Sequence, residues 1–185
     1  MFEKIFIHTP RQFVPTELNP GEWPSLEPLF DQLEQQLTDA SDAAQLEQAI
    51  LNWEELSAAL AEEGSKRYIA MTCQTEDTAA ETAYLEFVEK IDPEEKQRNF
   101  RLAKALTEPP YRAGLDARRY EVFTRDTALE VELFRSENVA LETETTKLGQ
   151  QYQKVIGGLT VQFDGEDLTL VQMGRYLEET DRDLR

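Results

Sequence analysis

Residues 134–170 read FRSENVALETETTKLGQQYQKVIGGLTVQFDGEDLTL, and this stretch decides the fold class. Its first part carries apolar side chains at spacings of three and four, which is typical of one face of a long helix. Ser136 is positioned to cap the start of this helix, and Gly157-Gly158 end it because glycine readily adopts the backbone conformation of a helix end. The predicted stripe consists of Leu141, Thr145, Leu148, Tyr152 and Val155 or Ile156.

A β-hairpin is predicted after this helix, because apolar and polar residues alternate on both sides of Asp164-Gly165. Asp-Gly is a signal for a two-residue type I′ turn, which would place Val161 opposite Leu168. A four-residue loop keeps the same facing and pairs Phe163 with Leu168 instead. The sequence leaves these two loops open, but it excludes a slip by one residue, which would put the apolar sets on opposite faces.

Helices are also predicted in the first half of the chain. Apolar residues recur at helical spacing from Pro24 onward, and again after a break at residues 39–42 that supplies a new N-cap. Gly64 or Ser65 is expected to bend or cap the second of these helices. The predicted buried stripes are Leu26, Leu29, Phe30, Leu33 and Leu37 in the first helix, and Leu46, Ile50, Trp53, Leu56 and Leu60 in the second.

Three more helix starts follow from local signals. Thr75 or Asp77 is expected to open a helix that runs to Ile91. The sequence DPEE at residues 92–95 opens the next one, with an N-cap, a proline in the first position and acids near the positive end of the helix dipole. A further helix is predicted over residues 120–134.

The chain is therefore expected to be mainly α, with antiparallel helix hairpins or a helical bundle and one small β-hairpin near residues 159–170. We interpret residues 1–23 as an irregular N-terminal arm, because proline and glycine punctuate them. Residues 24–110 are expected to form a first helical group. Residues 111–185 are expected to form a second helical group that includes the hairpin.

Composition restricts the partners. The chain has 185 residues, of which 37 are acidic and 19 basic, so its net charge is −18 at pH 7. Nucleic acid and anionic membrane surfaces carry the same sign, and neither is expected as a partner. No apolar run approaches the roughly 20 residues that a membrane-spanning helix needs, and the N-terminus lacks the apolar core of a secretory signal. A single cysteine allows no internal disulfide, so a cytoplasmic location is expected.

Side chains suited to catalysis are scarce. His8 is the only histidine, whereas a hydrolytic zinc site needs three protein ligands, commonly with two histidines at helical spacing. Cys73 is the only cysteine, and a cysteine nucleophile needs a base that only His8 could supply. We therefore expect Cys73 to be a buried structural residue.

Two acidic patterns are further candidates for a site. Glu130, Glu137 and Glu144 share a seven-residue spacing, but Ser136 interrupts the helix between them, so a solvated acidic face is expected. FDGED at residues 163–167 resembles part of a calcium loop, yet it lacks the spaced oxygen ligands and the final glutamate of an EF-hand, which leaves a plain turn. From the residues alone, we predict no catalytic, cofactor-binding or metal-binding residue in this chain.

Five segments of the chain, taken in order, carry a family resemblance. They are RYIAMTCQTEDT (67–78), AYLEFVEKIDP (83–93), LFRSENVALETE (133–144), YQKVIGGLTVQFDGEDLTL (152–170) and YLEETDRDLR (176–185). Together they resemble the N-terminal region of the oligoendopeptidase F family, zinc metallopeptidases related to thimet oligopeptidase. The resemblance covers most of the chain from Phe13 onward.

The resemblance implies a mainly helical fold in which two lobes enclose a deep channel, with the N-terminal lobe as a wall that limits substrates to short peptides. It also implies a zinc ion held by an HExxH motif and a further glutamate, and this sequence contains none of these positions. The chain alone is therefore expected to be inactive and to hold no cofactor. Its implied partners are the C-terminal catalytic half, in the same or a separate chain, and short peptides.

Two interpretations of the whole chain remain open at this point. TDRDLR at residues 180–185 resembles a helix that has barely begun, so we interpret Arg185 as a cut in a longer polypeptide. The alternative is a non-catalytic helical module, derived from such a peptidase, that binds peptides or a protein. A lobe should expose a contiguous apolar face where its other half packs, whereas a finished module should be polar there.

Overall fold

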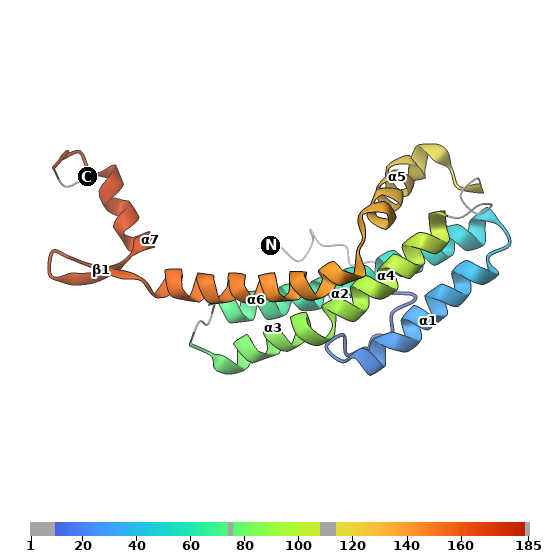
Figure 1. The fold of residues 1–185 in the computed structure, drawn as a ribbon, viewed down its shortest axis with the longest axis horizontal. Coiled ribbons are helices and arrows are strands. Elements are labelled where there is room, and N and C mark those ends of the chain that lie inside the picture. The colour runs from blue at the N-terminus through green and yellow to red at the C-terminus, as the bar shows by residue number, and fades with distance from the viewer. Residues whose placement is uncertain (1–9, 74–75, 108–113, 184–185) are drawn as a thin grey trace. The chain divides into compact units, whose positions relative to one another are not determined.

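The structure is a computed structural model that describes residues 10–73, 76–107 and 114–183. Figure 1 shows a mainly helical chain with one two-stranded antiparallel sheet, which confirms the expected fold class. The elements are α1 (Trp23–Asp39), α2 (Ala43–Cys73), α3 (Thr78–Lys90), α4 (Asp92–Thr107), α5 (Ala117–Leu133), α6 (Ser136–Gly158), β1 (Thr160–Phe163), β2 (Glu166–Thr169), α7 (Leu170–Met173) and the 3₁₀ helix η2 (Gly174–Glu178).

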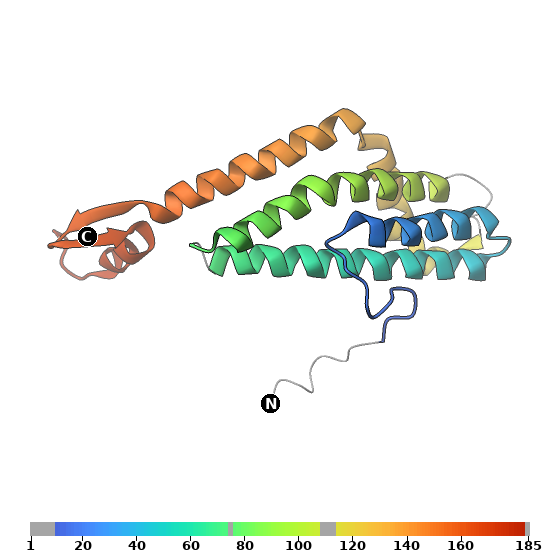
Figure 2. The same cartoon turned by 90° about the horizontal axis from the view of Figure 1, so that it is seen from below.

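Contacts divide the chain into two compact units, residues 1–143 and 144–185, and α6 belongs partly to each. Within the first unit, α1 and α3 each pack on both α2 and α4, and α5 packs on α4 (Figure 2). The division into residues 1–23, 24–110 and 111–185 stays a prediction from the sequence.

The core of the first unit is built from the predicted stripes. All five predicted residues of α1 and all five of α2 are buried, because each helix turns its apolar face toward its neighbours. The break between these helices is also confirmed, since Asp42 Oδ1 accepts a hydrogen bond of 2.9 Å from the Gln45 amide in the first turn of α2.

The second helix is longer than expected. α2 does not end at Gly64 or Ser65 but continues to Cys73, so the expected cap at Gly64 or Ser65 is wrong. A Cβ atom at Gly64 would lie 3.2 Å from Cε1 of Phe87, a buried residue of α3. The glycine therefore serves the close approach of α3, and it does so inside an unbroken helix.

Side-chain hydrogen bonds cap the start of α3 and join α4 to α1. Asp77 caps α3, as predicted for one of two positions, because its carboxylate accepts from the amides of Ala79 and Ala80; Thr75 lies outside the described residues. Arg98 joins α4 to α1 by donating to Asp31 over 2.7 Å and to Glu34 over 3.0 Å.

A carboxylate of α2 helps to attach the segment before α1. Glu55 of α2 accepts hydrogen bonds from the backbone amides of Gln12, Phe13 and Val14 at 2.8 to 3.0 Å. Burial acts to raise the pKa of Glu55, but the three amide donors and the Arg11 charge outweigh it and leave the pKa below its ordinary value. The same contacts bring Val14 into the core, where it is buried.

The hairpin of the second unit resolves the question of its loop. Val161 pairs with Leu168 and Phe163 pairs with Glu166, so the two-residue turn is confirmed and the four-residue loop is wrong. Asp164 and Gly165 have φ values of 51° and 81°, as a type I′ turn requires.

The residues after the hairpin form short elements. Thr169 caps α7 in a reciprocal pair of hydrogen bonds with Gln172, a capping box. The chain then passes through η2 into a bend and a turn, in which Asp181 accepts a hydrogen bond from the amide of Asp183.

Candidate functional site

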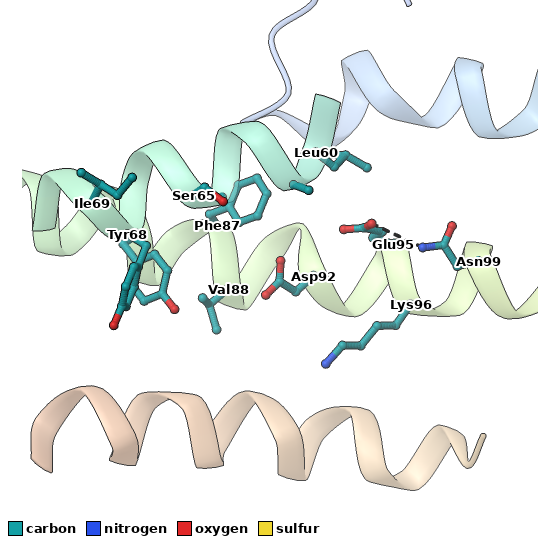
Figure 3. Close-up of a pocket in the computed structure, with 13 residues that line it drawn as sticks. Leu60, Ser65, Tyr68, Ile69, Phe87, Val88, Asp92, Glu95, Lys96 and Asn99 are labelled. Carbon is teal, nitrogen blue, oxygen red and sulfur yellow. Dashed lines mark hydrogen bonds between the residues drawn. The ribbon is translucent and has the colours of Figure 1, made fainter. Parts of the chain in front are cut away.

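A groove of about 650 Å³ lies between α2, α3 and α4 of the first unit. Figure 3 shows its residues, which reach it from all three helices. One part of its wall is apolar, with Leu60 from α2 and Phe87 and Val88 from α3. The groove is therefore a product of how α3 packs across α2 and α4, and not of any single segment.

Two carboxyl groups enter this groove from the first turn of α4. Asp92 and Glu95 are three residues apart, a spacing that puts both side chains on one face of a helix. Figure 3 shows both of them among the apolar residues that line the groove. The acids that the sequence indicated as partners of the helix dipole thus also form the polar part of a hollow.

Burial changes the acidity of both groups. Burial is the largest cause that raises the pKa of Glu95 to about 7; the Asp92 charge raises this pKa further, and Asn99 and Lys96 oppose the increase. Burial also raises the pKa of Asp92, and Lys96 opposes this only in part. Both carboxylates are therefore poorly solvated when ionised, which makes an added positive charge favourable beside them.

A hydrogen-bonded chain orients Glu95. Trp53 Nε1 of α2 donates to Asn99 Oδ1, and Asn99 Nδ2 donates to Glu95 Oε1 over 3.3 Å. Because the indole has only a donor, it fixes which side of the amide faces the carboxyl group.

Two tyrosines also line the groove. The rings of Tyr68 in α2 and Tyr84 in α3 meet edge to face, with centroids 5.5 Å apart. Burial raises the pKa of Tyr84, and the charge of Asp92 adds to this effect, so the phenol and the carboxylate share one environment.

One basic side chain also lines the groove, and it is engaged elsewhere. Lys96 Nζ forms an ion pair of 2.5 Å with Glu142 Oε2. Two carboxylates and one paired lysine leave the groove with an excess of negative charge.

The candidate site residues that the sequence offers and that the structure describes do not line this groove. His8 lies outside the described residues. The expectation that Cys73 is buried is wrong, because Cys73 is exposed at the last position of α2. Met71, two positions earlier, is 3% exposed, and two residues along a helix point about 200° apart.

The two acidic patterns follow their predicted behaviour. Glu130 lies in α5 and Glu137 and Glu144 lie in α6, and all three are exposed. The break at residues 134–135 separates the two helices, so the seven-residue spacing forms no continuous helix face. FDGED forms the hairpin turn and the start of β2.

Sequence reasoning missed the groove, although one signal was present. Asp92, Glu95 and Asn99 follow each other at spacings of three and four, which places polar groups along one face of α4. Phe87 of α3 lines the same groove, and the spacing along α4 alone does not show that residues of other helices enclose these acids.

The described residues do not fit a zinc site. Within residues 10–73, 76–107 and 114–183, no three His, Cys, Asp or Glu side chains gather closely enough to hold a metal ion. We therefore assign no zinc chemistry to these residues, and the expectation that the chain holds no cofactor stays a prediction. In the described part of the chain, no helix is both long and apolar enough to cross a membrane.

Comparison with known proteins assigns this helical fold to a class, the N-terminal domains of peptidases. The sequence model of the family described as Peptidase M3 N-terminal domain matches residues 13–134, so the chain belongs to that family. This match confirms the resemblance to the N-terminal region of an oligoendopeptidase-like enzyme.

A solved structure shares the fold over nearly the whole chain. The structure titled PZ peptidase A with inhibitor 2 matches with a TM-score of 0.75 and 23% sequence identity. The match covers 94% of this chain and 31% of that one, so the chain spans less than a third of the length of the protein that it resembles. Comparison with curated protein sequences finds no significant match.

Proposed function

We propose that this chain forms the N-terminal helical lobe of a zinc-dependent oligoendopeptidase and contributes part of the wall of its substrate channel. In this proposal the complete enzyme hydrolyses short peptides, and the zinc and its ligands belong to a C-terminal catalytic half. The match of residues 13–134 to the Peptidase M3 N-terminal domain carries the proposal. The extent of the structural likeness, 94% of this chain but 31% of PZ peptidase A, supports it.

An apolar surface on α6 favours a lobe over a self-sufficient binding module. Leu148, Tyr152 and Val155 are spaced by four and three residues, so they share one helix face. Their exposed fractions are 62%, 61% and 64%. Solvent-exposed apolar residues that line up on one face are typical of a surface that another polypeptide covers.

The hairpin and the helix after it add to the apolar surface of the second unit. Large side chains are exposed on both sides of the turn and beyond it, and Val171 has an exposed fraction of 89%. A unit of about forty residues with so many apolar side chains in water gains stability when a partner buries them.

The first test is to read the coding DNA beyond the codon for Arg185. We expect a downstream reading frame, continuous or separate, that encodes HExxH and a further glutamate. A stop followed by no such frame would contradict the lobe and favour the non-catalytic binding module.

The second test is enzymatic and uses a quenched fluorogenic peptide. We expect no chelator-sensitive turnover by this chain alone, and turnover when it is joined or mixed with the downstream half. Turnover by the chain alone that a chelator abolishes would sink the assignment of zinc to the other half. A downstream half that is equally active and stable without this chain would sink the role as a channel wall.

A further inference from the structure

The groove between α2, α3 and α4 differs from a cluster of acidic residues on an open surface in two features. Its walls are apolar and aromatic, and its two carboxyl groups are shielded from water by those walls. Within the described ranges, neither Asp92 nor Glu95 has a Lys or Arg nitrogen within ion-pair distance. An ionised carboxylate in such surroundings is stabilised by a cation that enters with little water of its own.

We propose that this groove binds the basic side chain, lysine or arginine, of a peptide segment in which that residue stands beside apolar residues. The carboxylates of Asp92 and Glu95 hold the positive charge, and Tyr68, Tyr84 and the apolar wall hold the stem. This proposal rests on the proposed function only in taking a peptide as the ligand, and it deepens that function by naming a substrate class.

Charge complementarity favours a cation over other ligands. The chain carries a net charge of −18, so cationic peptides are attracted to it from a distance and anionic ones are repelled. Lys96, the one basic residue that lines the groove, is paired with Glu142 at 2.5 Å and does not neutralise both acids. A second cation can therefore be accommodated.

The shape and chemistry of the walls favour an organic cation over a metal ion. A lysine or arginine side chain has a long apolar stem and a charged head, which matches an apolar wall that ends at two carboxylates. The paired rings of Tyr68 and Tyr84 add aromatic surface along which the apolar stem can lie. In the described part of the chain, no third His, Cys, Asp or Glu side chain gathers with these two carboxylates, so the groove offers a metal ion fewer charged ligands than apolar surface.

The test is a calorimetric titration of the full chain with three synthetic peptides at about pH 8, where Glu95 is mostly ionised. The peptides are acetyl-Leu-Lys-Leu-amide and its counterparts with Gln or Glu in place of Lys. We expect the Lys peptide to bind roughly tenfold more tightly than the Gln peptide, and the Glu peptide to bind most weakly, because only the first supplies the missing charge.

Variants connect the binding to the groove. Asp92→Asn and Glu95→Gln are expected to weaken binding of the Lys peptide roughly tenfold, and circular dichroism checks that each variant is folded. Glu94→Gln is the matched control, because Glu94 also lies in the first turn of α4 but is exposed and does not line the groove. Its affinity should equal that of the wild type.

Three outcomes would overturn the proposal. These are no binding of the Lys peptide, equal binding of the Lys and Gln peptides, and binding that neither Asp92→Asn nor Glu95→Gln weakens. Tight binding of all three peptides would identify the groove as a purely apolar docking surface, and it also counts against a cation site. The titration measures binding and not turnover. Its failure would therefore contradict the cation site, whereas the proposed enzyme lobe is tested separately by the fluorogenic peptide assay.

Discussion

The indole Nε1 of Trp53 donates a hydrogen bond of 2.8 Å to the side-chain oxygen of Asn99. This contact turns the amide nitrogen of Asn99 toward Glu95, the carboxyl group whose pKa burial raises to about 7. A residue of α2 therefore controls the hydrogen bonding of an acid on α4. The same acid also makes the stability of the protein depend on pH near neutrality.

Replacing Glu95 with Gln should stabilise the protein at about pH 8 and have little effect at acidic pH. Because the folded-state pKa of Glu95 is raised from its ordinary 4.5 to about 7, its stabilising contribution is complete below the ordinary value and is lost as the pH rises through 7. The loss for the wild type is about 3 kcal/mol at most. Urea unfolding of both proteins across this pH range measures it, with Glu94→Gln as the control. A difference between variant and wild type that does not change with pH would contradict the raised pKa.

Replacing Glu55 with Gln should loosen the segment before α1. The charged carboxylate accepts three backbone amides, so its loss should cost about 1–2 kcal/mol at neutral pH. Because the folded-state pKa of Glu55 lies below its ordinary value, this stability is present above the ordinary pKa and is lost as the pH falls through the folded value. Variant and wild type should therefore converge in acid.

Hydrogen exchange locates the effect of the Glu55 change. The amides of Gln12, Phe13 and Val14 should exchange faster in Glu55→Gln, whereas Glu54→Gln, a change at an exposed neighbour in α2, should leave them protected. Unchanged protection in Glu55→Gln would show that other contacts hold this segment.

Replacing Gly165 with Val should destabilise the hairpin. Gly165 has a φ of 81°, which a β-branched side chain tolerates poorly, and the expected cost is about 1–2 kcal/mol. No atom lies within 4 Å of the added Cβ, so the cost comes from the backbone and not from a clash. Gly165→Asn is the control, because asparagine accepts this conformation. Equal exchange protection of β1 and β2 amides in the Val variant and the wild type would show that the turn is not strained.

Replacing Leu148 and Val155 with Lys should barely affect the chain by itself. Both residues are more than half exposed, so a change within about 0.5 kcal/mol is expected in urea unfolding. Leu56→Ala, in the core, is the control that should cost about 2–5 kcal/mol. Joined to the downstream half of the proposed enzyme, the double Lys variant should lose assembly or activity. A variant that keeps both would show that this face of α6 is not a docking surface.

The helical spacing of apolar residues correctly predicted the buried faces of α1 and α2. The stripes of α1 and α2 are all buried, because each helix turns its apolar face toward the helices packed against it. The Asp164-Gly165 signal predicted the hairpin, and the observed pairing of Phe163 with Glu166 then decided between its two possible loops.

The predictions that failed share a physical cause. The type and spacing of residues along one helix do not show which other elements of the protein cover them. Leu148 and Tyr152 have the same spacing as core residues and yet are exposed. Cys73 has the residue type of a core position and yet ends its helix in solvent. The raised pKa of Glu95 comes mainly from its burial in a groove that α2, α3 and α4 build together, and no local rule brings these helices together.

The missing side chain of Gly64 has a consequence for the width of the groove. Because a Cβ atom there would lie 3.2 Å from Cε1 of Phe87, a single methyl group would require the ring to shift by a few tenths of an ångström. Alanine at position 64 would therefore alter the shape of the groove without replacing Asp92 or Glu95. The space open to a ligand thus depends in part on a residue of α2 that carries no side chain of its own.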